Sequence, residues 1–215
     1  LALEFRFTLM IKFLKSLFYS TPEENYDPMK YLIVGLGNIG SDYAGTRHNI
    51  GFDVVNMMAK DADVSWKQET LGDVAELKHK GRTLVLLKPS TYMNKSGKAL
   101  KYWMEKKKIP IDNVLAVVDE LQLELGVIRL KPKGSDGGHN GLKDIAEVLG
   151  STKYSRLRVG IGKDFRRGQQ IDHVLGKWNA KEKDELIEII PRACETAKSF
   201  AAVGLKFTME KYNQK

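Results

Sequence analysis

The segment YLIVGLGNIG, residues 31–40, decides the fold, because an apolar run typical of a buried strand leads directly into a glycine-rich turn. Its glycines match the G-x-G-x-x-G fingerprint of dinucleotide-binding folds, in which the last glycine opens a helix that holds a pyrophosphate. Here helical periodicity resumes only near Asn49, beyond a further glycine, Gly45. The acidic residues about 20 positions on, Asp61 and Asp63, end a helical pattern instead of a second strand. The segment therefore predicts the first strand and tight turn of an α/β domain rather than a dinucleotide site.

Length and composition indicate one basic globular domain. The chain has 215 residues, of which 42% are hydrophobic, and a formal net charge of +8. This charge favours a polyanionic partner or an anionic substrate, although a merely basic surface is the alternative. A single cysteine, Cys194, excludes an internal disulfide framework and indicates a reducing compartment, so we expect the cytoplasm. There is no run of 18 apolar residues, and we expect no membrane span.

Residues 1–28 differ from the rest of the chain. They contain an apolar stretch interrupted by Lys12 and Lys15, followed by a polar linker over 20–28. Without a small-residue cleavage site, a secretory signal is not favoured. Two interpretations stay open: an amphipathic targeting or membrane-surface helix, or sequence upstream of a start at Met29. We place the domain at residues 29–215.

The remaining elements alternate between strand and helix, which is typical of a single α/β domain. Two strands around a short turn at residues 79–81 predict an antiparallel hairpin, so the sheet is expected to be mixed and twisted, with helices on its flanks. The apolar run 114–118 is typical of a central strand buried on both faces. Further strands are expected at 127–130 and 157–161, and helices at 49–59, 96–107, 142–149 and over most of the last 35 residues, with Pro191 at the start of the final helix.

Four loops that follow or adjoin these strands carry unusual polar residues. Ligand sites in open α/β sheets gather at the carboxyl ends of strands, so we expect the four loops to meet. A single loop asparagine is more often a turn former, but asparagines in three such loops, together with a histidine and an aspartate, predict a pocket. The loops are residues 38–48, 88–94, 119–120 and 134–141.

His48 is the natural general base of this pocket, because an imidazole titrates near neutral pH and can take a proton from water. Asp119, at the end of the central strand, is expected to hold the other ring nitrogen and stabilise the imidazolium. No serine lies in a G-x-S-x-G turn, and the four histidines lack the spacing of a zinc site, so neither a covalent nucleophile nor a metal is expected. His139 is expected only to shape its glycine-rich loop.

The four loops together resemble the bacterial-type peptidyl-tRNA hydrolase family, with matching order and spacing over residues 30–212. The resemblance implies a monomeric α/β enzyme without a cofactor or a stable protein partner, which cleaves the ester between a peptide and tRNA and so recycles tRNA from aborted translation. The matching strings are VGLGNIG (34–40), Tyr43, TRHNIGF (46–52), KPSTYMNKSG (88–97), VDE (118–120), GGHNGLKDI (137–145) and RLRVGIG (156–162).

By position, the resemblance implies that His48 is the catalytic base, that Asp119 stabilises its protonated form, and that Asn38 distinguishes blocked from unblocked aminoacyl ends. The remaining positions implied are Tyr43, Tyr92, Asn94 and Asn140 for contacts with the tRNA substrate, Met93 for a wall of the peptide pocket, and Arg129 and Arg158 for a clamp on the tRNA 5′-phosphate. The family commonly has lysine at the position of Arg129.

Cationic residues crowd the second half of the chain and fit phosphate contacts that position RNA without reading its sequence. Two other functions stay open: a non-catalytic RNA-binding module or assembly factor, and a nicotinamide-dependent oxidoreductase. The first has no need for His48 and Asp119 together, and the second predicts saturable NAD binding. The cations are Lys131, Lys133, Lys143, Arg156, Arg158, Arg166 and Arg167.

Overall fold

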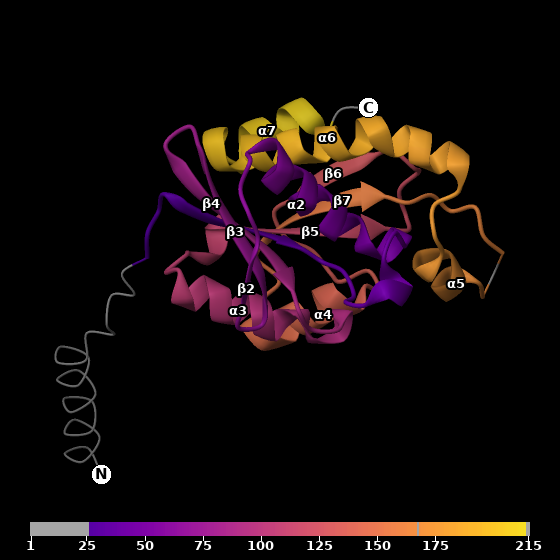
Figure 1. Ribbon diagram of the computed structural model, residues 1–215, viewed down its shortest axis with the longest axis horizontal. Coiled ribbons are helices and arrows are strands. Elements are labelled where there is room, and N and C mark those ends of the chain that lie inside the picture. The colour runs from indigo at the N-terminus through magenta and orange to yellow at the C-terminus, as the bar shows by residue number, and fades with distance from the viewer. Residues whose placement is uncertain (1–25, 167, 214–215) are drawn as a thin grey trace, which may run out of the picture.

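A single seven-stranded sheet with helices on both faces organises the part of the chain that the structure, a computed structural model, describes, residues 26–166 and 168–213 (Figure 1). The predictions for residues 1–25 and for Arg167 concern positions outside the described residues. The strands are β1 Lys30–Gly35, β2 Lys67–Glu69, β3 Gly72–His79, β4 Arg82–Pro89, β5 Val114–Glu120, β6 Ile128–Lys131 and β7 Ser155–Gly160; the helices are α2 Ile50–Asp61, α3 Ser96–Lys106, α4 Asn140–Leu149, α5 Gln170–Leu175, α6 Ala180–Val203 and α7 Leu205–Tyr212.

The sheet is mixed, as predicted. Its strand order is β2-β3-β4-β1-β5-β7-β6, with β4, β1, β5 and β7 parallel to one another. β3 pairs antiparallel with β4 in the predicted hairpin, where His79 faces Arg82 across the turn, and β6 pairs antiparallel with β7 at the other edge. The carboxyl ends of the four parallel strands therefore meet at one edge of the sheet, which is where α/β folds place their ligand sites.

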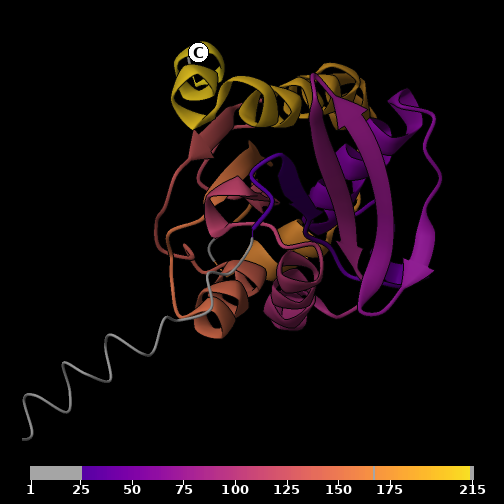
Figure 2. The same cartoon turned by 90° about the vertical axis from the view of Figure 1, so that its left-hand side faces the viewer.

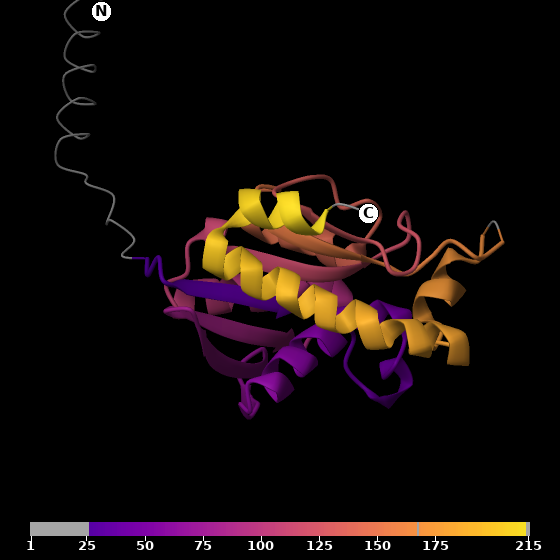
Figure 3. The same ribbon diagram turned by 90° about the horizontal axis from the view of Figure 1, so that it is seen from above.

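Each face of the sheet is covered by its own helices, as Figure 2 shows, and Figure 3 looks onto the face over which α6 and α7 lie. One core lies under α2 and α6 and includes Val54 and the predicted core residue Cys194. The other lies under α3 and α4 and includes Leu100 and Trp103. No helix in the described ranges is long and apolar enough to cross a membrane.

Two glycines of the opening motif bring α2 against the sheet. A Cβ atom on Gly35 would lie 2.2 Å from the carbonyl oxygen of Gly51, and one on Gly51 would lie 2.5 Å from the backbone oxygens of Leu36 and Val117. Gly40 has a φ of 102°, a conformation that favours glycine. The glycine pattern thus serves a close helix–sheet approach and a turn, and α2 begins at Ile50, as its periodicity predicts.

Three features differ from the sequence prediction. Pro191 lies inside α6 instead of starting a helix. The φ angle that the proline ring imposes is compatible with a helix. Because proline has no N–H, the carbonyl of Ile187 lacks its helical partner, but Ile187 is 70% exposed. The short elements β2 and α5 were not predicted. All three residues of β2 are exposed, so no apolar pattern marks it.

We predict that Gly51→Ala lowers the free energy of unfolding by about 2–3 kcal/mol, because the added methyl group forces α2 away from β1 and β5. Asn56→Ala, at an exposed position of the same helix, should change stability by less than about 0.5 kcal/mol. Urea denaturation of the three proteins measures both values. Equal stabilities would show that the close approach is not required.

Candidate active site

A cleft of about 690 Å³ lies at the carboxyl ends of β1, β4 and β5. It brings together the residues of all four polar loops, as the sequence predicted, and α5 forms one further wall. The residues that line it include Asn38, Tyr43, His48, Tyr92, Met93, Asn94, Asp119, His139, Asn140 and Val174.

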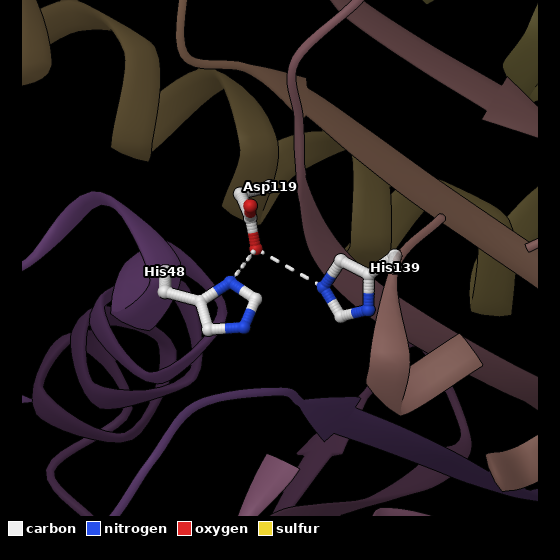
Figure 4. Close-up of side chains that lie close together, drawn as sticks. All are labelled: His48, Asp119 and His139. Atoms are coloured by element: carbon white, nitrogen blue, oxygen red, sulfur yellow. Dashed lines mark hydrogen bonds and ion pairs between the residues drawn. The ribbon is translucent and has the colours of Figure 1, made fainter. Parts of the chain in front are cut away.

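His48 and Asp119 form a hydrogen-bonded pair in this cleft. His48 lies on a single 3₁₀ turn, Arg47–Asn49, directly before α2, and Asp119 is the penultimate residue of β5. The His48 Nδ1 atom is 2.8 Å from Asp119 Oδ1 (Figure 4). Burial alone would raise the pKa of Asp119, but the neighbouring imidazoles of His139 and His48 outweigh it and hold this pKa well below its usual range. Asp119 is therefore a carboxylate that accepts a hydrogen bond from Nδ1–H of His48, which leaves the unprotonated Nε2 as the base.

His139 is the second partner of the same carboxylate oxygen, and sequence reasoning missed this contact. Its Nε2 atom lies 3.1 Å from Asp119 Oδ1. Its Nδ1 atom caps α4 by accepting bonds from the backbone N–H groups of Gly141 and Leu142. Because Nδ1 accepts, the proton of a neutral ring sits on Nε2 and is donated to Asp119. The loop contribution that the sequence predicted is thus real, and the ring also joins α4 to the catalytic pair.

Ligand atoms of His48, Asp119 and His139 lie within 4.8 Å of one another, a spacing that a metal ion could use. Metal binding needs an unprotonated ring nitrogen from each histidine. The capping bonds to Nδ1 of His139 place its proton on the nitrogen that faces the carboxylate. The donor set therefore fits a hydrogen-bonded triad better than a metal site.

Asn38 is held rigidly by a second asparagine, Asn49. The Asn49 side chain accepts a bond from the backbone N–H of Asn38 at 2.8 Å and donates one to its carbonyl at 2.9 Å. The Asn38 Oδ1 atom accepts from the backbone N–H of Met93 at 2.8 Å. With its oxygen occupied, Asn38 has its amide N–H groups available to a ligand in the cleft. Asn49 is buried, and nothing in its local sequence pattern indicated that its side chain would hold the backbone of Asn38.

Asn94 and Asn140 lie close to the starts of α3 and α4, two helices that are hydrogen-bonded to each other. Asn94 lies in the 3₁₀ turn before α3, and Asn140 is the first residue of α4. The Asp144 carboxylate of α4 accepts a 2.6 Å bond from the backbone N–H of Gly97 in α3. The two amides therefore reach the cleft from a pair of helices with a fixed spacing.

Arg47, the neighbour of His48, anchors the base from the opposite side. Its guanidinium donates to both carboxylate oxygens of Glu182 in α6 and, at 3.1 Å, to the carbonyl of His173 in α5. It also stacks over Trp178. The His48 turn is thus tied to the C-terminal helices and cannot shift independently of them.

The comparison with known proteins agrees with this geometry. The model of the peptidyl-tRNA hydrolase family matches residues 32–215. The chain belongs to the peptidyl-tRNA hydrolase family. The peptidyl-tRNA hydrolases of Porphyromonas gingivalis and Parabacteroides distasonis are 53% and 54% identical to it, over 86% and 87% of this chain and 100% of each relative. The crystal structure of peptidyl-tRNA hydrolase from Acinetobacter baumannii is 36% identical and matches with a TM-score of 0.81 over 88% of this chain and 97% of that one.

The family resemblance and the α/β fold expected from the sequence are thus confirmed, whereas the residue roles stay predictions. Arg129 and Arg158 do not line the cleft. They face each other across β6 and β7, and the Nε atom of Arg158 donates to Glu120 at 2.6 Å. Arg156 was expected to contact phosphate, which is wrong, because its side chain is buried and bonded to backbone carbonyl groups.

Two variants of His139 separate its capping bond from its bond to Asp119. Asn is a good helix cap and Ala is not, so we expect His139→Ala to be about 1 kcal/mol less stable than His139→Asn. Both variants lose the bond to Asp119, and we expect both to lose about tenfold or more in kcat on peptidyl-tRNA. Denaturation and single-turnover assays measure the two effects. Wild-type kcat in His139→Asn would contradict a role for this bond.

Proposed function

We propose that this chain hydrolyses the ester bond between a peptide, or an N-blocked amino acid, and tRNA. The observation that carries the proposal is the 2.8 Å bond between His48 Nδ1 and the buried Asp119 carboxylate, which directs the basic Nε2 atom of His48 to a cleft rich in amides. Membership of the peptidyl-tRNA hydrolase family supports the same substrate.

In the proposed reaction, His48 Nε2 takes a proton from a water molecule whose oxygen attacks the ester carbonyl carbon. Asp119 stabilises the imidazolium that forms. The bond between the carbonyl carbon and the ribose oxygen then breaks, and the proton passes from His48 to that ribose oxygen. The products are a free tRNA hydroxyl and a peptide carboxylic acid, which releases its remaining proton to the solvent to become a carboxylate. An ester is reactive enough for this route to need neither a covalent nucleophile nor a metal.

Asn38 is suited to distinguish blocked from unblocked substrates. Its oxygen accepts a hydrogen bond from the backbone N–H of Met93, and this bond fixes the amide so that its N–H groups can donate to a ligand in the cleft. The carbonyl of an N-acyl group or peptide accepts such a bond. A free ammonium has no acceptor and loses this contact, and a site that leaves polar groups unpaired rejects a ligand strongly. Asn94 and Asn140, with Tyr43 and Tyr92, would contact the tRNA substrate, and Met93 would form a wall of the peptide pocket.

The tRNA would be held by the sheet edge beside the cleft. Arg129 and Lys131 of β6 pair with Arg158 and Arg156 of β7, so their side chains lie on one face. With Arg156 buried, Arg129 and Lys131 are left to meet phosphates, together with Arg158, whose ion pair with Glu120 a phosphate would have to share or replace. We further infer that the chain acts as a monomer in the cytoplasm, without a stable protein partner, and that residues 29–215 form the catalytic domain.

The central test compares release of N-blocked and unblocked aminoacyl groups from tRNA. We expect the wild type to release only the blocked group efficiently. His48→Ala should lose at least about 10³-fold in kcat, since it lacks the base, while its affinity for tRNA stays within about twofold because the phosphate contacts are unchanged. Substantial hydrolysis by His48→Ala would contradict the assigned role. A non-catalytic RNA-binding module predicts tRNA binding without release, and an oxidoreductase predicts NAD binding.

The basic sheet edge predicts a steep dependence of tRNA affinity on salt, because bound phosphates release counterions. We expect Arg129→Ala and Arg158→Ala each to reduce the slope of log affinity against log salt by about one. Lys60→Ala removes an exposed cation from α2, on the other face of the sheet, and should leave the slope unchanged. Filter binding over a salt series measures these slopes, and three equal reductions would place the tRNA elsewhere.

A further inference from the structure

Arg156 is a buried cation that lies close to the cleft. It is 2% exposed, and none of the ion pairs within the described ranges includes it. Its Nη1 atom donates to the carbonyl groups of Gly134 and Ser135 at 2.6 and 2.7 Å, and its Nη2 atom to that of Thr152 at 3.0 Å. The guanidinium also lies 4.4 Å from the centre of the Tyr154 ring.

The three carbonyl groups belong to the two ends of one structural unit. Gly134 and Ser135 begin the loop that leads to His139, and Thr152 follows the end of α4. A single side chain of β7 therefore bonds the backbone on both sides of the segment that carries His139 and Asn140. Figure 4 shows His139 next to His48 and Asp119, with its ring directed at the Asp119 carboxylate to which it is hydrogen-bonded.

Arginine chemistry explains why this residue type occupies the position. Burial of a charge is unfavourable unless hydrogen bonds replace its hydration. The planar guanidinium offers several donors in a fixed fork, whereas a lysine ammonium is a point charge on a flexible stem. Burial lowers the pKa of Arg156, but an arginine stays protonated in proteins, so the three carbonyl groups bind a permanent cation. The arrangement fixes backbone geometry rather than attracting an anion.

We propose that Arg156 is a positioning residue for the reaction, which holds the loop and α4 so that His139 Nε2–H meets Asp119. This inference rests on the proposed function for its catalytic consequence. The bond between His139 and Asp119 spans only 3.1 Å, so a shift of the loop by about 1 Å removes it. Misplacement on that scale reduces turnover by up to about 100-fold.

The test compares Arg156→Lys with Arg192→Lys. Arg192 also donates to a backbone carbonyl, that of Gly126, but lies on α6, on the opposite face of the sheet from α4. We expect Arg156→Lys to lower kcat about 10- to 100-fold, to leave affinity for deacylated tRNA within about twofold, and to weaken the hydrogen bond from His139 Nε2–H to Asp119, so that the signal of this proton moves upfield and the proton exchanges faster with water. Arg192→Lys should change none of these. Single-turnover hydrolysis, filter binding and long-range ¹H–¹⁵N correlation of the imidazoles provide the readouts.

Two results would overturn the proposal: wild-type kcat in a folded Arg156→Lys, or a reduced kcat with unchanged His139 signals. If Arg156→Lys does not fold, Gly134→Ala tests the same contact with the arginine retained, because its Cβ atom would lie 3.3 Å from Arg156 Nη1. An unchanged His139 Nε2–H signal in Gly134→Ala would also overturn the proposal. If the wild type fails to hydrolyse peptidyl-tRNA, the proposed function fails, whereas the comparison of the Nε2–H signals still tests the positioning contact.

Discussion

One buried carboxylate oxygen, Oδ1 of Asp119, holds the site together. It accepts hydrogen bonds from two imidazoles that arrive from opposite sides, at 2.8 Å from His48 and 3.1 Å from His139. A carboxylate that is only 5% exposed would be costly to ionise without such donors. The two histidines supply them, and the charge in turn selects which nitrogen of each ring carries its proton. The same atom therefore links β5, the turn before α2 and the start of α4.

The rest of the fold keeps these three elements in register. Because Gly35 and Gly51 have no side chains, the backbone of α2, the helix after His48, packs directly against the backbone of the sheet. Arg47 fixes the His48 turn from the side of α6, and Arg156 fixes the loop before α4 from the side of β7. Arg47 and Arg156, of which the sequence suggested the second as a phosphate contact, thus have mainly internal partners. The cations left for tRNA lie on the edge formed by β6 and β7.

The sequence predicts those parts of this arrangement that local patterns determine. The apolar run of β5 locates Asp119, and the late helical periodicity places His48 before α2 rather than inside it. The contact between His139 and Asp119 was not predictable, since 20 residues separate the two and the path of the loop depends on Arg156. The prediction that Pro191 starts a helix was wrong because it considered proline alone. The capping box at the start of α6 and the packing of its buried face stabilise the helix by more than the one missing hydrogen bond costs.

The measurement that tests the account most directly is the tautomer of His48 in the wild-type protein, observed by long-range ¹H–¹⁵N correlation at a pH where the ring is neutral. The account predicts a proton on Nδ1, bonded to Asp119, and an unprotonated Nε2 that faces the cleft. The signals can be assigned by their absence in a variant that lacks this histidine. A proton on Nε2 of the neutral ring would contradict this assignment, because the nitrogen that faces the cleft would then have no lone pair to accept a proton from water.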